Sequence, residues 1–362
     1  MIDWNRVKKT ASILSEYDLD ALMIAPSADM EYLSEMSMRP DERLKLIVVL
    51  SDGSVFCIAP KLYRGEFEEY IGSEAPIYIW NDNDWFHSTV EEAFKKHNLR
   101  GKKIGVNTGV RAVDAVDIQK RNSVSLFNGE EIIAALRMIK DANEIDLMDR
   151  SGEICDTILV ELKSFIKPGM TEKDIRRYIM KRFEELGADY NSWNPIVAAG
   201  PNGALPNYGG EDSVIREKDV IVIDIGAGYK RYRSDITRTY FVGEPTQKQR
   251  DVFEAVLGAQ EAAEKMVAPG ILACEIHDTA TKYMERAGFG HTFLTRTGHG
   301  VGREGHEFPY ITYSNTAPLR EGMCFSVEPS ASLPGEFGVR VENTVTVTKD
   351  GVHSFNKCPK RM

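Results

Sequence analysis

The sequence predicts an α/β domain over residues 1–129, followed by an α+β domain over residues 130–362 that contains an internal pseudo-twofold repeat. Two observations lead to this fold class. Up to residue 129, short apolar runs alternate with helical patterns, as they do in α/β domains. Beyond residue 130, one arrangement of helices and a β-hairpin occurs twice in succession.

The composition is that of an ordinary globular protein. The chain has 362 residues, of which 42% are hydrophobic and 28% charged. At about 150 residues per domain, this length suggests two to three domains. The formal net charge of −10 has the wrong sign for coating nucleic acid or an anionic membrane. We therefore expect neither partner.

The cysteines and the apolar runs indicate a cytoplasmic location. Five scattered cysteines show no zinc-site or redox-motif spacing, so we expect reduced thiols in the core. The first residues lack the apolar run of a secretory signal. No run approaches the roughly 20 apolar residues of a membrane-spanning helix.

The first domain is expected to alternate helices and strands. A helical pattern covers Val7 to Ser15, and a charged helix is expected near Val90 to Lys96. Ser51-Asp-Gly-Ser54 has the composition of a hairpin turn between two of the apolar runs. Strands are expected at Ala21–Ile24, Leu46–Leu50, Val55–Ala59, Ile77–Trp80 and Lys103–Val106.

The second domain is expected to begin with a helix that links the two domains. Apolar residues from Ile132 to Ile139 lie on one helical face, and we place this linking helix over residues 130–148. A second amphipathic helix ends at Lys167-Pro-Gly169. Thr171 and Asp174 then form a capping box that opens a third helix.

An internal duplication follows from matched turns and matched hairpins. Pro168-Gly169 recurs as Pro269-Gly270, and Gly187 recurs as Gly288, at the same offset. Each copy is followed by two strand-like segments. These hairpin segments are Val220–Gly226 with Ser234–Val242, and Met323–Glu328 with Val339–Val347.

Each predicted hairpin carries one carboxylate on each arm. Asp224 and Asp235 belong to the first hairpin, and Glu328 and Glu342 to the second. A carboxylate between Ile223 and Ile225 on a central strand is costly to keep ionised without a positive partner. Any one acid could instead pair with an arginine such as Arg233, Arg238 or Arg340. Four acids in symmetry-matched hairpins favour two divalent ions bound side by side.

A glycine-rich loop supplies two candidate imidazoles. His299 lies in Gly298-His-Gly-Val-Gly302, between the two acidic hairpins, and His306 follows closely. An oxygen-rich site favours Mn²⁺, and one histidine ligand would also admit Co²⁺, Fe²⁺ or Zn²⁺. The histidines elsewhere in the chain are read as structural or surface residues.

These motifs together resemble the pita-bread metallopeptidases, specifically their prolidase and aminopeptidase P branch. The resemblance covers nearly the whole chain and includes a leading domain like that of creatinase and prolidase. The motifs that carry it are Asp224-x-Gly226, Ser234-Asp235-Ile-Thr-Arg-Thr239, Gly298-His299-Gly300-x-Gly302, His306-Glu307-x-Pro309, Glu328-Pro329 and Gly338-Val-Arg-Val-Glu342.

The resemblance implies a two-metal hydrolase with assigned residue roles. It makes Asp224, Asp235, His299, Glu328 and Glu342 the metal ligands, with Asp235 and Glu342 bridging the ions. It implies that a hydroxide between the metals attacks the amide bond of Xaa-Pro dipeptides or short peptides. Glu328 would also be the general base, and His306 would steady the carbonyl oxygen. Arg340 and Asn207 would contact the substrate, and a homodimer is expected.

Two positions depart from the family pattern. Leu205-Pro-Asn207-Tyr208 stands where prolidases commonly have Pro-His, and Thr295 replaces a histidine four residues before His299. Both family histidines help to hold the substrate. These differences leave open a same-fold enzyme that acts on a non-peptide small molecule, such as an ectoine-type amide or a sulfonium compound. A non-catalytic binding protein is the third alternative, disfavoured by the complete ligand set.

Overall fold

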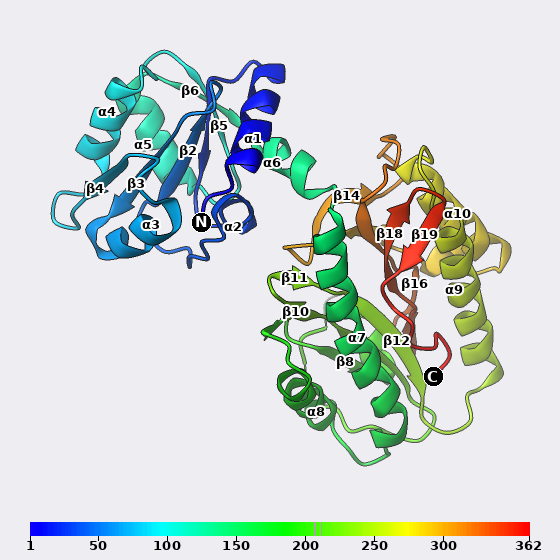
Figure 1. Cartoon of the computed structure of the whole chain (residues 1–362). Helices are drawn as coiled ribbons and strands as arrows, with labels where there is room; N and C mark the ends of the chain where they lie inside the picture. Colours follow the sequence, from blue (N-terminus) through cyan, green and yellow to red (C-terminus); the bar gives the residue numbers. More distant parts are fainter. Residues whose placement is uncertain (206–207, 211) are drawn as a thin grey trace. The chain divides into compact units, whose positions relative to one another are not determined.

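The computed structural model describes residues 1–205, 208–210 and 212–362. The chain forms two compact units, Met1–Arg137 and Met138–Met362, which are described separately (Figure 1). Among the described residues, no helix is both long and apolar enough to cross a membrane.

The first unit is a mixed six-stranded sheet covered by helices on both faces (Figure 1). The strand order is β4-β3-β2-β1-β5-β6, with antiparallel pairing at β1/β2 and β2/β3 and parallel pairing elsewhere. Its elements are α1 (Trp4–Glu16), β1 (Ala21–Ile24), α2 (Ala28–Ser34), β2 (Leu46–Leu50), β3 (Val55–Pro60), η1 (Lys61–Tyr63), α3 (Arg64–Ile71), β4 (Ile77–Trp80), α4 (His87–Lys96), β5 (Lys103–Val106), α5 (Ala112–Asn122), β6 (Ser125–Asn128) and α6 (Glu130–Arg137).

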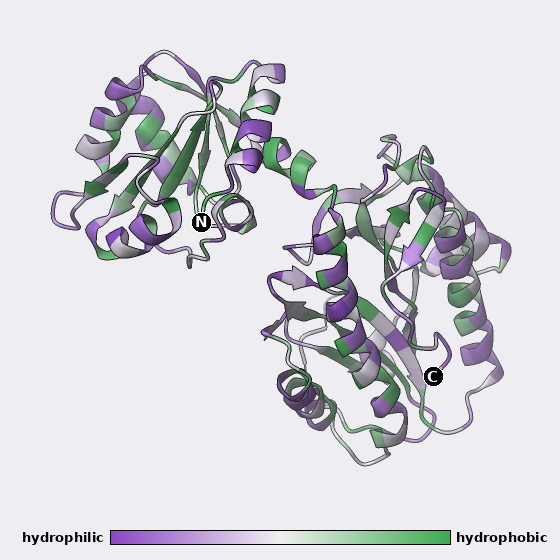
Figure 2. Ribbon diagram, viewed as in Figure 1, coloured by the Kyte–Doolittle hydropathy of each residue, from purple (hydrophilic) through white to green (hydrophobic). Residues whose placement is uncertain are grey.

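The central strands of this sheet are apolar at every position because both faces are buried. Along β1, Leu22 and Ile24 belong to one core and Ala21 and Met23 to the other. Figure 2 shows the apolar strands enclosed between helices with polar outer faces. Burial on both faces explains why the strands appear in the sequence as continuous apolar runs.

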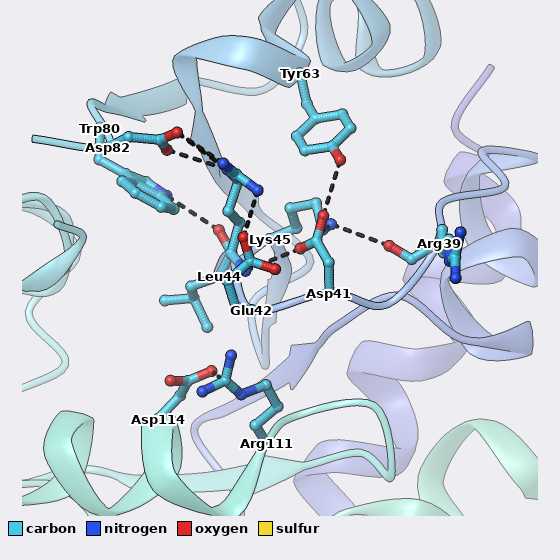
Figure 3. A network of polar contacts seen from close by, with 11 residues as sticks. Arg39, Asp41, Glu42, Leu44, Lys45, Tyr63, Trp80, Asp82, Arg111 and Asp114 are labelled. Atoms are coloured by element: carbon cyan, nitrogen blue, oxygen red, sulfur yellow. Dashed lines mark hydrogen bonds and ion pairs between the residues drawn. The ribbon is translucent and has the colours of Figure 1, made fainter.

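A polar network fixes the loop that precedes β2 (Figure 3). The Lys45 side chain is only 1% exposed, and its Nζ donates to Asp41 Oδ1 at 2.7 Å. Asp41 also accepts a hydrogen bond from the Tyr63 hydroxyl at 2.8 Å, while Arg43 pairs with Asp82 at the end of β4. The loop is therefore held to η1 and to β4 by charged contacts.

The second unit contains two helix-and-sheet halves. The first half packs α7 and α8 against β8, β9 and β12, and the second packs α9 and α10 against β15, β17 and β18 (Figure 1). Its elements are α7 (Ala142–Phe165), α8 (Glu172–Glu185), β7 (Tyr190–Asn191), β8 (Ile196–Ala199), η2 (Gly200–Ala204), β9 (Val220–Ile225), β10 (Ala227–Tyr229), β11 (Tyr232–Arg233), β12 (Ile236–Phe241), α9 (Gln247–Lys265), α10 (Ala273–Arg286), η3 (Gly290–Thr292), β13 (Gly298–Gly300), β14 (Glu307–Ile311), β15 (Cys324–Val327), β16 (Ser330–Leu333), β17 (Phe337–Arg340), β18 (Asn343–Thr348) and β19 (Gly351–Ser354).

Matching backbone geometry supports the duplication. Gly169 and Gly270 have φ angles of 91° and 87°, and Gly187 and Gly288 have 82° and 86°. These left-handed values suit glycine, which bears no Cβ. The antiparallel triple β8-β9-β12 in the first half corresponds to β13-β15-β18 in the second.

The second hairpin differs from its expected form. The segment 339–347 was expected to be one arm, but it contains two strands, β17 and β18, separated by Val341 and Glu342. A small hairpin of β16 and β17 lies between the paired strands β15 and β18. The backbone N–H of Glu342 donates to the Thr237 carbonyl of the first half instead. Contact with the other half therefore interrupts the strand at Glu342.

The segment that joins the two units also differs from its expected form. The compact units divide after Arg137, not after residue 129, and the helix expected over 130–148 is two helices, α6 and α7. Arg137 Nη1 donates to Asp29 Oδ1 at 2.7 Å inside the first unit. A capping box of Asp141 and Glu144 begins α7. The residues between the two helices instead pair with the second unit, through the Ile139–Met323 bridge and the bond from the Lys140 N–H to the Gly322 carbonyl.

Candidate metal centre

The four hairpin carboxylates converge between the two halves of the second unit. Asp224 lies near the end of β9, and Glu328 directly follows β15. Asp235 and Glu342 directly precede the matched strands β12 and β18. Because these strands occupy equivalent places in the two halves, duplication brings four acids to one point.

His299 completes this cluster from β13. Its Nε2 lies 3.0 Å from Glu328 Oε1 and 3.6 Å from Asp235 Oδ2. A Cβ on the preceding Gly298 would lie 1.8 Å from the Ser326 carbonyl oxygen, so only glycine permits this close approach of β13 to β15. The glycine-rich sequence thus brings the imidazole to the carboxylates.

The donor atoms fit divalent metal ions. Two groups of ligand atoms, one from His299, Glu328 and Glu342 and one from Asp224, Asp235 and Glu342, each lie within 4.8 Å of one another. Asp224 Oδ1 and Glu342 Oε1 are buried and have no hydrogen-bond partner. Buried carboxylate oxygens in this state need a positive partner. Carboxylates with one imidazole suit Mn²⁺, Fe²⁺, Co²⁺ or Zn²⁺.

The tautomer of His299 is also suitable for a metal ligand. His299 Nδ1 lies 3.2 Å from the Gly300 carbonyl oxygen. Because a carbonyl only accepts hydrogen bonds, this contact accommodates a proton on Nδ1. Without a metal ion, Nε2 is within hydrogen-bond distance of the Glu328 carboxylate, which also only accepts. A metal ion would take the place of the proton on Nε2 while Nδ1 keeps its own, which is the arrangement that metal-binding histidines use.

The pKa values reflect the crowding of negative charge. Burial, and then the charges of Glu342 and Asp224, raise the pKa of Asp235 well above its ordinary value. Burial, followed by Glu328 and Asp224, does the same for the pKa of Glu342. Burial opposes ionisation of Glu328, but His299 and Arg340 outweigh it and lower its pKa to about 2. The site therefore stabilises added positive charge.

Arg340 provides part of that charge. Its Nη2 makes a short contact with Asp224 Oδ2, and its Nε donates to the Thr237 hydroxyl at 2.9 Å. The Thr237 hydroxyl donates in turn to Glu342 Oε2 at 2.6 Å. Pairing of a hairpin carboxylate with an arginine, the alternative to metal binding, thus occurs at Asp224. Arg238, by contrast, donates to the carbonyl oxygens of residues 237, 342, 358 and 359 and to the Asn343 side-chain oxygen.

His306 lies beside the candidate metal ligands and is more exposed than they are. Its ring centroid is 3.7 Å from that of His299. Burial, His299 and Arg296 lower the pKa of His306 to about 4. Arg296 Nη2 lies 3.0 Å from His306 Nδ1. Since a guanidinium only donates, the proton of the neutral ring lies on Nε2.

A cavity of about 550 Å³ is lined by six of these residues, namely Asp224, Asp235, His299, His306, Glu328 and Arg340. Its size is that of a small-ligand site. Thr295 lines it, with its hydroxyl 3.5 Å from Ser330 Oγ. Asn207 lies outside the described residues. Sequence reasoning did not identify the apolar wall, because nothing in a strand pattern shows which face meets a ligand. Members of this wall are Trp193, Ile196, Ala198, Val222 and Val339.

Comparisons with known proteins agree with this site. Residues 146–349 match the model of metallopeptidase family M24, and residues 6–139 match the creatinase/prolidase N-terminal domain. A duplicated fold with converging carboxylates and a histidine thus defines the class as metal-dependent peptidases. The chain belongs to metallopeptidase family M24.

Individual relatives cover nearly the whole chain. A probable dipeptidase PepE of Mycobacterium bovis is 32% identical, over 99% of this chain and 95% of its own. An Xaa-Pro dipeptidase of Pyrococcus horikoshii is 29% identical, over 99% and 98%. The crystal structure of a prolidase from Thermococcus sibiricus is 32% identical, with a TM-score of 0.93 and full coverage of both chains.

These similarities confirm the expected family and fold class. The protein is a metallopeptidase, and the family implies divalent metal ions. The comparisons support the peptidase interpretation and do not support the alternative of a non-peptide substrate.

Proposed function

We propose that this protein hydrolyses the amide bond of Xaa-Pro dipeptides or short peptides at a two-metal centre. The observation that carries the proposal is the convergence of five donor residues, four of which line a peptide-sized cavity. The ligands are Asp224, Asp235, His299, Glu328 and Glu342. Manganese is the favoured metal, with cobalt, zinc or iron as alternatives.

Bound divalent ions supply water activation at neutral pH and polarisation of the amide carbonyl. Glu328 accepts the proton that the attacking water loses and passes it to the leaving nitrogen. His306 donates from Nε2 to the carbonyl oxygen as negative charge develops there.

Other cavity residues bind and orient the substrate. Arg340 supports Asp224 and Glu342 through the contacts described above, and it lines the cavity. Ile196, Ala198, Val222 and Val339 offer an apolar surface that suits a proline ring. Asn207 is proposed as a substrate contact on sequence grounds alone.

The assembly and location are also proposals. We propose a homodimer in which the first unit, Met1–Arg137, restricts the substrate to short chains. The second unit, Met138–Met362, is then the catalytic part. A reducing cytoplasm is supported by five cysteines without disulfides, four of them buried.

The test is hydrolysis of an Xaa-Pro panel by stripped protein reloaded with Mn²⁺, Co²⁺ or Zn²⁺. The panel includes dipeptides, tripeptides and matched peptides without proline. We expect metal-restored cleavage of Xaa-Pro bonds, abolished by Asp235→Asn, and product lengths then distinguish a dipeptidase from an aminopeptidase. The proposal would be contradicted if wild-type protein with its full metal content hydrolysed none of the Xaa-Pro peptides.

A further inference from the structure

A buried ion pair lies directly behind the turn that carries His306. Lys140 Nζ donates to Glu307 Oε1 at 2.6 Å, and the two side chains are 2% and 6% exposed. His306 and Glu307 are adjacent in sequence but differ in environment. His306 lines the cavity, whereas Glu307 is buried against Lys140. The Lys140–Glu307 contact therefore lies on the buried side of this turn, and His306 lies on the side that lines the cavity.

The space around this pair is closely filled. A Cβ on Gly302 would lie 2.5 Å from Glu307 Oε1 and 2.8 Å from Lys140 Cε. The other carboxylate oxygen of Glu307 accepts from the Glu304 backbone N–H at 3.3 Å. Both oxygens of Glu307 thus hold the turn 302–307, one through its own backbone and one through Lys140.

Lys140 is itself fixed in the second unit. Its backbone N–H donates to the Gly322 carbonyl at 2.9 Å, and Ile139 forms a β-bridge with Met323. Glu144, in the same segment, is connected to the turn through Tyr232. Tyr232 donates to Glu144 Oε1 at 2.5 Å and accepts from Arg303 Nε at 3.1 Å. The segment 138–144 is therefore joined to one end of the turn directly, at Glu307, and to the other through Tyr232, at Arg303.

We propose that Lys140 is a positioning residue that holds His306 in its working orientation through Glu307. This inference rests on the proposed function, since His306 matters for catalysis only if it contacts the reacting carbonyl. A buried ion pair is weak evidence for stability, because apolar replacements of both partners often fold equally well. The position of this pair, directly next to His306, points to a role in orienting that side chain.

The test compares Lys140→Met with a matched control in the intact chain. Arg137→Met removes the cation of another buried pair, Asp29–Arg137, whose side chains are 7% exposed each. We expect Lys140→Met to lower kcat by about 10- to 100-fold, as displacement of a catalytic group by a fraction of an ångström to 1 Å does. KM and metal stoichiometry should change less than about threefold. Arg137→Met should leave kcat unchanged.

A double variant separates orientation from charge balance. Lys140→Met/Glu307→Met replaces both ions by apolar side chains and should recover the thermal stability lost in the single variant. We expect kcat to stay low in the double variant. Full recovery of kcat together with stability would overturn the proposal, because charge compensation alone would then explain the pair.

A second readout does not depend on activity. Histidine side-chain NMR of metal-free protein reports the ring nitrogens of His306, identified by their loss in His306→Gln. We expect Lys140→Met to shift these signals and Arg137→Met to leave them unchanged. Glu307→Gln should also shift the His306 signals, and it replaces Lys140→Met in this test if that variant does not fold. Unchanged His306 signals would overturn the proposal even if the wild type cleaved no Xaa-Pro peptide, which separates this failure from failure of the proposed function.

Discussion

The two halves of the second unit share their carboxylates but not their imidazole. In the first half Asp224 on β9 pairs across the sheet with Ile196 on β8. In the second half the Glu328 backbone N–H donates to the carbonyl of Thr297, which directly precedes the equivalent strand, β13. Two residues further along these strands are Ala198 and His299. Both line the cavity, so the duplicated position holds a methyl group in one half and an imidazole ring in the other.

This difference indicates that the two proposed ion positions are unequal. The carboxylates near Asp224 offer only oxygen, whereas the position near Glu328 also offers His299 Nε2. Imidazole favours Zn²⁺, Co²⁺ and Fe²⁺ more than carboxylate does. We therefore expect the two ions to differ in affinity even though the backbone around them is repeated.

The largest expected effect comes from removing the unmatched ligand. His299→Ala should lose one metal ion per chain and lower kcat by at least about 1,000-fold, because each catalytic ion supplies several kcal/mol. Metal content by mass spectrometry and kcat with Xaa-Pro peptides check this. Ala198→Ser, at the mirror position, is the control and should keep both ions. Equal loss of metal in the two variants would show that the halves contribute alike.

The next effect concerns His306, which belongs to the second half. His306→Ala should keep the full metal content and lower kcat by about 100- to 1,000-fold, the range for removal of one oxyanion donor. Steady-state kinetics with metal analysis measures both quantities. Loss of a metal ion in this variant would instead assign His306 to the ligand set, as its place near Asp235 and His299 allows.

The matched residues Asp235 and Glu342 should give metal-free protein a distinctive pH dependence. Carboxyl groups of the unfolded chain ionise near pH 4, whereas in the fold the pKa of Asp235 is raised. Above about pH 4 the folded state then binds more protons, so this contribution to stability falls as pH rises through the raised native pKa.

Calorimetry of metal-free protein between about pH 4 and pH 8 tests this dependence. We expect the Tm of wild type minus that of Asp235→Asn to decrease as pH rises, and the same for Glu342→Gln, whose parent residue also has a raised pKa. A difference that is constant with pH would contradict the prediction. If the Tm difference decreased with pH for only one of the two variants, Asp235 and Glu342 would not be equivalent.

The smallest effect tests a second difference between the halves. Glu172 at the start of α8 is fully buried and accepts from the Ala199 N–H and the Tyr208 hydroxyl, at 2.8 Å and 2.7 Å. The repeat offset places Ala273 at its counterpart. These bonds hold the segment whose Gly203 lines the cavity. Tyr208→Phe should raise KM by about 2- to 10-fold with little change in kcat, as expected for one hydrogen bond.

Kinetics with one Xaa-Pro dipeptide measure the Tyr208→Phe effect. Tyr283→Phe is a control on α10 of the second half, where the ring packs against Gly258 of α9, and it should leave KM unchanged. A fall in kcat without a change in KM would show that the loop acts on catalysis rather than on substrate binding.

Local sequence patterns predicted most of the scaffold and the carboxylate cluster. The expected strands Ala21–Ile24 and Leu46–Leu50 match β1 and β2 residue for residue. Repeated hairpins place their acids near one another because duplication repeats the geometry. Short helices such as α2 and α3 were not anticipated, since seven or eight residues show too little periodicity.

Long-range contacts could not be predicted in this way. The partner of Lys140 is 167 residues away in sequence, and the lysine appears in the chain as an ordinary polar residue. Likewise, three arginines were candidates for pairing with the hairpin acids, and only packing shows that Arg340 reaches Asp224. Trp193 lies outside any strand, so its place in the cavity wall depends on the fold of the whole unit.

Arg137 and Lys140 have a consequence for recombination between relatives of this protein. Arg137 bonds a residue earlier in the chain, Asp29, and Lys140 bonds a residue far downstream, Glu307. A gene crossover between codons 137 and 140 would keep both partnerships intact in a chimera. A crossover at residue 146, where the family match begins, would combine the Lys140 of one parent with the Glu307 of another. In this chain, an exchange of the leading unit at Met138 or Ile139 therefore separates neither Arg137 from Asp29 nor Lys140 from Glu307.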